Sequence, residues 1–266
     1  MKYKCLTIAG FDGSGGAGIQ ADLKTFTALG CYGMTVLTAI PIQNTQGVSN
    51  CYNISIKCID EQLESIFSDI KPDCIKIGMV YNDEIIKVIY KYLNKYKNIP
   101  VICDPVMLSK NGSLLLKDSA IESLKKLIFP LSALITPNLP EAYSLIGDKY
   151  NNKKTAVELL KFGSYAVLLK GGHSLDKNKC EDFLLTKDGE QKIFSSIRID
   201  SKNTHGTGCT LSAAICAYMA RGYNLANACE KAKLYLLDAI EHSRHYVIGN
   251  GNGPLNHLYK ICDSNL

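Results

Sequence analysis

The sequence contains no tryptophan, and its excess of positive charge is small, +5 across 266 residues. The basic residues are scattered among apolar and neutral ones, so the concentrated basic stripe typical of a nucleic-acid-binding protein is missing. No uncharged apolar segment approaches the roughly 18 residues that a membrane span needs. Neither a nucleic acid nor a membrane is therefore expected as a partner.

Cysteine pairs with the spacing of a metal or redox site are also missing, although the chain has 11 cysteines. No two of them are three positions apart, which excludes the CxxC pattern of zinc knuckles and dithiol redox sites. The apolar run at the N-terminus is too short for a secretory signal. Reduced cysteine behaves as a small hydrophobe, so we expect a protein of the reducing cytoplasm.

What the sequence does have is a regular alternation of short apolar runs with amphipathic helical patterns. The runs are apolar throughout, as expected for strands covered on both faces of a parallel sheet. The expected strands are residues 4–9, 34–40, 74–77, 101–103, 133–135, 165–169, 182–185 and 192–199. The expected helices are residues 19–28, 61–68, 84–95, 119–127, 207–220 and 225–242.

This alternation predicts an α/β fold, with a doubly wound, mostly parallel sheet and helices on both faces. The strands at 182–185 and 192–199 are predicted to form a hairpin near one edge. No repeat or long linker divides the chain, so we expect one domain over residues 1–266. Ligands of open α/β sheets bind outside the carboxyl ends of the strands, and the loops there should carry the chemistry.

A glycine-rich loop, Gly10 to Gly18, follows the first strand and opens the first helix. It formally satisfies GxGxxG, but the acidic residue that a dinucleotide site needs at the end of the second strand is absent. A nicotinamide-dependent dehydrogenase is therefore disfavoured. Two interpretations remain, an anion bound by the backbone N–H groups or a tight turn without a ligand.

A second glycine-rich loop precedes the helix predicted at 207–220. Gly206 and Gly208 allow successive N–H groups to point one way, which predicts an anion hole suited to a transferring phosphoryl group. Cys209 lies at the helix N-terminus, where the pKa of a thiol is commonly lowered. The alternative for Cys209 is a small buried hydrophobe.

Charged residues follow three other strands. Asp104 and Glu141 are candidates for Mg²⁺, which binds nucleotide phosphates together with one or two carboxylates. Their alternatives are a turn residue before Pro105 and a charge that compensates a helix dipole. Lys170, followed by two glycines, suits phosphate contact. Residues 106–116 combine glycine with apolar residues and are predicted to form a flap.

The histidines near the C-terminus match no carboxylate pattern. We interpret His242, His245 and His257 as surface residues.

Eight segments carry a resemblance that covers residues 6–254. They are residues 6–10, 14–24, 43–47, 76–79, 104–107, 136–141, 170–173 and 203–212. In this order they resemble the hydroxymethylpyrimidine/phosphomethylpyrimidine kinases of thiamine biosynthesis, within the ribokinase superfamily. The resemblance implies an ATP-dependent enzyme that phosphorylates 4-amino-5-hydroxymethyl-2-methylpyrimidine and then converts the monophosphate to the diphosphate.

The resemblance also implies a pyrimidine pocket. Asp22 and Gln43 would hydrogen-bond the aminopyrimidine ring, and the pocket would be lined by Gly10, Met79 and Val106.

For the nucleotide, the resemblance implies Mg²⁺ with ATP, organised by Asp104 and Glu141, and leaves room for a monovalent cation. It implies a homodimer. The residues implied at the nucleotide and the anion hole are Lys170, Thr204, Gly206, Thr207, Gly208, Cys209 and, at the adenine, Lys231 or Lys233.

Cys209 stands where most of the superfamily has an aspartate base. We expect Cys209 to assist deprotonation mainly in the first step, because the phosphate that attacks in the second step is already anionic.

Two other functions remain open. Residues 11–13 depart from the Ser/Thr-Asp-Pro of many such kinases, which leaves pyridoxal kinase as an alternative. The absence of cysteine from residues 108–113 counts against it, since related pyridoxal kinases carry one there. A non-catalytic pyrimidine- or nucleotide-binding protein would not need the two carboxylates.

Overall fold

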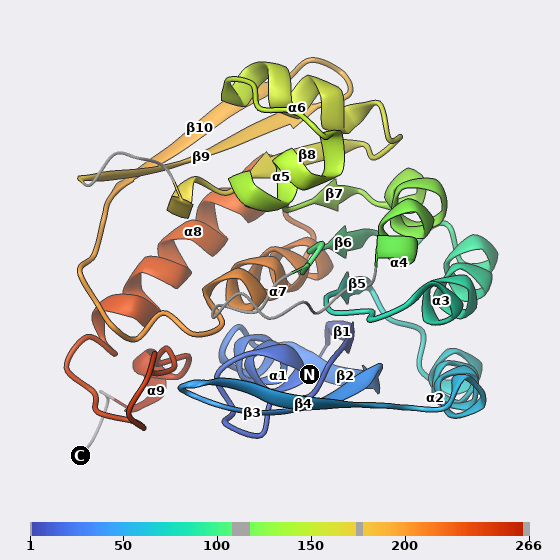
Figure 1. Ribbon diagram of the computed structural model, residues 1–266, viewed down its shortest axis with the longest axis horizontal. Coiled ribbons are helices and arrows are strands. Elements are labelled where there is room, and N and C mark those ends of the chain that lie inside the picture. Colours follow the sequence, from blue (N-terminus) through green and yellow to red (C-terminus); the bar gives the residue numbers. More distant parts are fainter. Residues whose placement is uncertain (1, 108–117, 174–177, 263–266) are drawn as a thin grey trace.

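Six strands pair in parallel at the centre of the protein. A computed structural model describes residues 2–107, 118–173 and 178–262. The sheet has eight strands in the order β10-β9-β8-β7-β6-β5-β1-β2 (Figure 1). These strands are β1 Lys4–Ala9, β2 Tyr32–Leu37, β5 Cys74–Ile77, β6 Val101–Cys103, β7 Leu134–Ile135, β8 Ala166–Leu169, β9 Lys179–Thr186 and β10 Gln191–Ile197. The antiparallel pair β9–β10 at the edge confirms the predicted hairpin.

The strand predicted at 34–40 is in fact two strands. β2 ends at Leu37, and β3 (Ala39–Asn44) belongs to a separate antiparallel pair with β4 (Gly47–Asn53). Between them, Thr38 donates a hydrogen bond from Oγ1 to the carbonyl oxygen of Met79 at 2.6 Å, which turns the chain out of the main sheet. β4 was not predicted because it is polar and largely exposed, without an apolar period.

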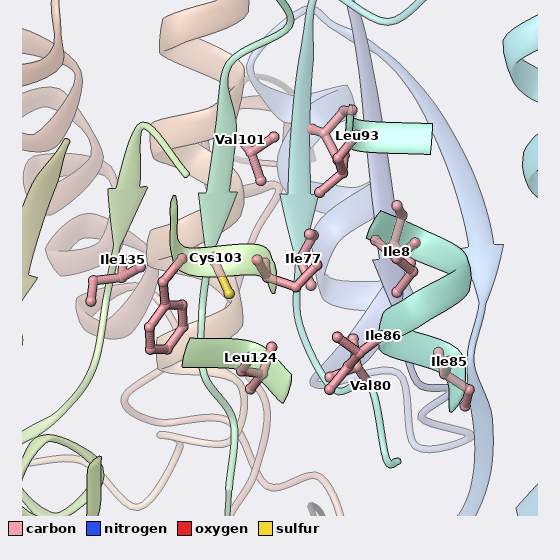
Figure 2. Packing of buried hydrophobic residues seen from close by; sticks show 14 of the residues in the cluster. Ile8, Ile77, Val80, Ile85, Ile86, Leu93, Val101, Cys103, Leu124 and Ile135 are labelled. Carbon is pink, nitrogen blue, oxygen red and sulfur yellow. The ribbon is translucent and has the colours of Figure 1, made fainter. Parts of the chain in front are cut away.

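Five helices cover one face of the sheet. They are α2 Ile56–Asp69, α3 Asp83–Lys95, α4 Asp118–Ser123, α5 Leu139–Ile146 and α6 Asn152–Leu160. Figure 2 shows Ile86 of α3 beside Val80, in the same buried cluster as Ile8 of β1 and Ile77 of β5. α4 continues as a π-helical turn, Leu124–Ile128, and a 3₁₀ turn, Phe129–Leu131, so the helix predicted at 119–127 changes its winding midway.

The opposite face is covered by α1 (Gly18–Ala28), α7 (Thr207–Ala220) and α8 (Leu225–Glu241). Alternate residues of the strands point to this side, among them Cys5, Cys74 and Ile102. α7 has buried residues nearly all round because it lies between the sheet and α8. Helices on both faces confirm the predicted fold class (Figure 1).

The remaining elements are a 3₁₀ turn after β8, Gly171–His173, and a short helix near the C-terminus, α9 (Tyr259–Cys262). In the described ranges, no helix is both long enough and apolar enough to cross a bilayer.

Candidate active site

The carboxyl ends of β6, β7 and β8 bring three polar side chains together. Asp104, 1% exposed, accepts a hydrogen bond from Lys170 Nζ at 2.6 Å and another from Thr136 Oγ1 at 3.1 Å, both at Oδ1. Burial works to lower the pKa of Lys170, but Asp104 and Glu141 raise it above its ordinary value. The lysine is therefore a permanent positive charge at this edge of the sheet.

Glu141 lies in the first turn of α5 and faces the same lysine. Its Oε2 accepts a hydrogen bond from the backbone N–H of Asn138, whose side chain accepts from the N–H of Glu141, which completes a capping box. Oε2 also lies 3.9 Å from Lys170 Nζ. Burial raises the pKa of Glu141 to about 7, against the lowering effect of Lys170. Compensation of the helix dipole, the alternative raised from the sequence, is compatible with this position in the first turn, so two roles are open to Glu141.

The second glycine loop lies against this charged group. Gly206 caps α7 with a φ of 83°, the left-handed region that favours glycine. A Cβ atom on Gly208 would lie 3.3 Å from Lys170 Nζ and 3.5 Å from Asp104 Oδ2. The first turn of α7 therefore opens beside a lysine and an aspartate.

Cys209 follows in the same turn and is partly buried. Burial raises the pKa of its thiol to about 11, although the Lys76 ammonium works to lower it. The sequence-based expectation of a lowered pKa is wrong, because loss of solvation outweighs the favourable charges at this helix N-terminus. The thiol is neutral in this state of the protein.

Asp22 is buried in α1 and bonded to two neighbouring side chains. Its side chain is 0% exposed, and its oxygens accept hydrogen bonds from Lys76 Nζ at 2.8 and 3.1 Å and from Thr7 Oγ1 at 2.6 Å. Burial raises the pKa of Asp22, and the lysine opposes that shift. This departs from the expectation of a direct hydrogen bond to the pyrimidine, since every partner of the carboxylate here is internal.

Three residues expected to line the pyrimidine pocket do lie together. A Cβ atom on Gly10 would stand 2.9 Å from Met79 Sδ, so glycine is needed at this close approach. Gln43 Nε2 donates to the carbonyl oxygen of Phe11 at 3.1 Å, which places its amide beside the same loop. Val106 follows Asp104 by two residues and is partly buried. The predicted flap beyond it, at 108–116, lies outside the described residues.

The first glycine loop binds its own carboxylate. The N–H groups of Gly16 and Ala17 donate to Asp12 Oδ2 at 3.1 and 2.7 Å. Of the two interpretations left open by the sequence, the turn without an external anion is the one that the structure supports.

Lys233 is occupied in a buried ion pair. Its Nζ lies 2.8 Å from Asp182 Oδ2, and the other oxygen of Asp182 accepts from the backbone N–H of Gly171 at 2.7 Å. Lys233 thus supports the segment that follows Lys170, which differs from the expected contact with adenine. Thr204 and Thr207 flank Gly206 and are both partly buried.

His257 corrects another expectation. It is 3% exposed, and its Nε2 lies 2.9 Å from Thr210 Oγ1 in the first turns of α7. Burial lowers the pKa of His257 to about 4. His242 and His245 are exposed, as predicted.

The family model for phosphomethylpyrimidine kinase matches residues 12–256 of this chain. The hydroxymethylpyrimidine/phosphomethylpyrimidine kinase of Escherichia coli (strain K12) is 45% identical over 263 residues, which cover 97% of this chain and 98% of that protein. The chain belongs to the phosphomethylpyrimidine kinase family. The recognition made from the eight segments is thereby confirmed.

Solved structures agree with this family. The crystal structure of a phosphomethylpyrimidine kinase from Clostridium difficile 630 has a TM-score of 0.79 and 45% identity, covering 90% of this chain and 100% of that one. An ADP complex of Bacillus subtilis pyridoxal kinase has a TM-score of 0.87 at 35% identity, covering 97% and 98%. The fold is thus shared with pyridoxal kinases, which are more distant in sequence.

The donor set of this phosphomethylpyrimidine kinase family member suits a magnesium ion carried by a nucleotide. Asp104 and Glu141 both face Lys170, and carboxylates in this number are what Mg²⁺ takes when phosphates and water complete its shell. Among the described residues, no group of three or more histidine, cysteine, aspartate or glutamate side chains could hold a metal by itself. Asp104 and Glu141 therefore suit a metal ion that binds together with the nucleotide.

Sequence reasoning missed three charged or polar residues around the site, the buried Asp12 and Lys76 and the partly buried His205. Lys76 lies in an expected apolar strand, where a lone lysine is itself a signal of a buried partner. Asp12 begins a local turn in which Oδ1 accepts from the N–H of Ser14, an Asx pattern that the sequence Asp-Gly-Ser could have indicated.

Proposed function

We propose that this protein transfers the γ-phosphoryl group of ATP to 4-amino-5-hydroxymethyl-2-methylpyrimidine and to its monophosphate. One observation carries the proposal, namely that Lys170 and Asp104 lie beside Gly208 at the open N-terminus of α7. Family membership supports the choice of substrates, since the E. coli relative has this name. The diphosphate made in the second step serves thiamine biosynthesis.

The chain's own residues stabilise the transferring group electrostatically. The N–H groups of Gly208 and Cys209 and the ammonium of Lys170 would face the negative oxygens, in a position fixed before substrate binds. Asp104 and Glu141 would hold Mg²⁺ together with the nucleotide, and the bound ion would neutralise phosphate charge. In this arrangement the ammonium of Lys170 would leave Asp104 and contact the phosphates instead.

The acceptor binds at the other side of Cys209. Gly10, Met79, Gln43 and Val106 would surround the pyrimidine, and the thiol of Cys209 would lie near the acceptor oxygen. Because the pKa of this thiol is about 11, Cys209 holds its proton at neutral pH and can orient the hydroxyl before it acts on it. The ion pair of Asp22 and Lys76 supports the floor beneath.

ATP consumption with product identification tests the proposal. The hydroxymethylpyrimidine, its monophosphate and pyridoxal are offered in parallel with Mg²⁺. We expect the diphosphate from the monophosphate, a product that a pyridoxal kinase has no reason to make. Absence of any product from all three acceptors would instead favour a non-catalytic binding protein.

Pyridoxal phosphorylation is the second candidate, and the TM-score of 0.87 with the B. subtilis pyridoxal kinase favours it. Phosphorylation of pyridoxal with no product from the monophosphate would instead indicate a pyridoxal kinase of vitamin B6 salvage.

We also propose that residues 1–266 form one kinase domain that acts as a homodimer in the cytoplasm, with a flap at 106–116. Sedimentation equilibrium tests the dimer, and activity compared in sodium and potassium salts tests the monovalent cation.

A further inference from the structure

Two segments far apart in the sequence meet at a buried carboxylate. Asp12, 0% exposed, follows β1, and its Oδ2 lies 2.8 Å from Nε2 of His205, which precedes the N-terminus of α7. Its Oδ1 accepts from the N–H and the hydroxyl of Ser14 at 2.9 and 2.7 Å. With the two N–H groups from Gly16 and Ala17 already described, the carboxylate has five hydrogen-bonding partners and is fixed in place.

The backbones of the two segments are also in direct contact. A Cβ atom on Gly206 would lie 1.8 Å from the carbonyl oxygen of Gly16, and one on Gly16 would lie 2.5 Å from Cδ2 of His205. On its far side, His205 donates its backbone N–H to the carbonyl oxygen of Gly253 at 3.0 Å. His205 is thus held between the β1 loop and the C-terminal segment, directly before the anion hole.

The loop that holds Asp12 also shapes the acceptor pocket. Gly18 packs so closely on Gly10 that a Cβ atom would lie 2.3 Å from the Gly10 carbonyl oxygen, and Phe11 accepts the hydrogen bond from Gln43. At the other end, Gly206 leads within two residues to Gly208, beside Lys170. One hydrogen bond therefore connects the part of the chain that would hold the pyrimidine with the part that would hold the phosphoryl group.

We propose that the Asp12–His205 hydrogen bond is a positioning device for phosphoryl transfer, which fixes the N-terminus of α7 relative to the acceptor pocket. Asp12 and His205 touch no reacting atom and act through Gly206–Cys209 on one side and Gly10–Phe11 on the other. This inference rests on the proposed kinase function.

The physical basis is the sensitivity of transfer to alignment. Misplacement of reacting groups by about 1 Å can cost on the order of 100-fold in rate. A hydrogen bond to an ionised carboxylate is stronger than one between neutral groups. The hydrogen bonds from His205 and Ser14 outweigh the effect of burial and hold the pKa of Asp12 at about 2, so the carboxylate is ionised at any working pH.

Three variants and a control test the device. His205→Ala removes the donor, His205→Gln places an amide nitrogen where Nε2 lies, and Asp12→Asn weakens the acceptor. His245→Ala removes an exposed histidine and is the matched control. Steady-state kinetics with ATP and the pyrimidine monophosphate give kcat and both KM values, and thermal unfolding reports the folded fraction.

We expect His205→Ala to lower kcat by about 10- to 100-fold, with both KM values changed only a few-fold, because alignment is lost while binding contacts remain. His205→Gln should recover most of kcat. The double variant Asp12→Asn/His205→Ala should lose less than the product of the two single losses, because both substitutions remove the Asp12–His205 hydrogen bond, while Asp12→Asn also weakens those from Ser14, Gly16 and Ala17.

A kcat of His205→Ala within twofold of the parent and control would overturn the proposal, as would a loss seen in KM alone. If His205→Ala does not fold, His205→Gln and Asp12→Asn decide, and kcat values equal to the parent in both would also overturn it. The parent protein is measured first, so failure of the proposed function appears there. The same comparison then uses pyridoxal phosphorylation or ATP hydrolysis.

Discussion

Cys209 shows at the scale of one residue how burial and charge compete. Its position in the first turn of α7 favours a thiolate, yet its thiol has a pKa of about 11 because solvation is lost. A neutral thiol is not a base, so Cys209 can assist deprotonation of the acceptor hydroxyl only after it loses its own proton, a loss that the charge of Lys76 favours. The two phosphorylation steps should therefore depend on Cys209 to different extents.

We predict that Cys209→Ala lowers kcat with the hydroxymethylpyrimidine by about 100-fold or more, which is typical for loss of a general base. The monophosphate should lose much less, because its attacking oxygen already carries charge. Product formation from each acceptor, measured with the same enzyme preparation, checks the difference. An equal loss in both steps would show that Cys209 has no special part in deprotonation.

His257 gives a prediction about stability at the same scale. Its pKa is lowered to about 4 in the folded protein, from 6.5 when unfolded. The unfolded chain therefore binds more protons between these values, and the free energy of unfolding falls as the pH drops from about 6.5 to about 4. The shift corresponds to about 3 kcal/mol at most.

His257→Gln keeps a polar partner for Thr210 but cannot be protonated, so its acid-induced loss of stability should be smaller by a measurable part of that amount. Urea unfolding at pH 7.5, 5.5 and 4.5 measures it. His245→Gln, an exposed site, serves as the control. Identical pH profiles for the two variants would contradict the buried, neutral state of His257.

At the scale of the element, α7 begins where it does because Gly206 adopts a φ of 83° against the carbonyl oxygen of Gly16. Gly222 has a similar φ of 88°, but a Cβ atom there would meet no atom within 4 Å. Substitution of Gly222 would introduce backbone strain alone, whereas substitution of Gly206 would introduce the same strain and a steric clash. Comparison of the two variants therefore distinguishes the two contributions to the free energy of unfolding.

Gly222→Ala should lower the free energy of unfolding by about 1 kcal/mol, the cost of an L residue in the left-handed region. Gly206→Ala should cost clearly more and abolish measurable kinase activity, because the N-terminus of α7 must move. Urea unfolding and ATP turnover on both variants check this. Equal stability of the two would mean that the close packing of Gly206 on Gly16 can relax freely.

The elements differ in how well the sequence predicts them, and the reason is physical. β5 and β6 were predicted with their exact bounds because both faces are buried and every residue is apolar or, at Lys76, internally paired. β4 lacks such a pattern, since it pairs only with β3 in an exposed two-stranded ribbon. α5 and α6 were missed because α5 carries a proline in its first turn and α6 begins with four polar residues, which leaves little apolar period in either.

The sequence likewise predicts the residues of the site better than it predicts their contacts. The residue types and their order along the chain indicated Lys170, Asp104 and the Gly206 loop, which the structure brings together. The sequence could not show that Asp22 is paired with Lys76, because 54 positions separate them and they meet only through the packing of α1 over β1, the neighbour of β5 in the sheet. Desolvation of Cys209 likewise depends on tertiary packing.

At the scale of the whole molecule, the Asp22–Lys76 pair holds α1 against the central strands β1 and β5. Both side chains are 0% exposed, so neither charge can reach water if its partner is lost. Removal of one partner of a buried pair typically costs about 3–5 kcal/mol.

We therefore predict that Lys76→Met lowers the free energy of unfolding by about this amount, and that Lys76→Met/Asp22→Asn recovers more than half of it. Urea unfolding measures both. Lys91→Met, which removes an exposed pair with Asp60, should cost less than about 1 kcal/mol. A single variant as stable as the double would show that water or another group compensates Asp22.

The order in which the two faces of the sheet are covered has a consequence for synthesis of the protein. Cys5 of β1 and Cys74 of β5 are covered by α7, whose residues lie at 207–220. At a ribosomal rate of about 5–20 residues per second, the first strand waits on the order of 10–40 seconds for that helix. During this interval the nascent chain exposes an apolar surface that bears free thiols, and it is then a natural client for chaperones and a target for oxidants.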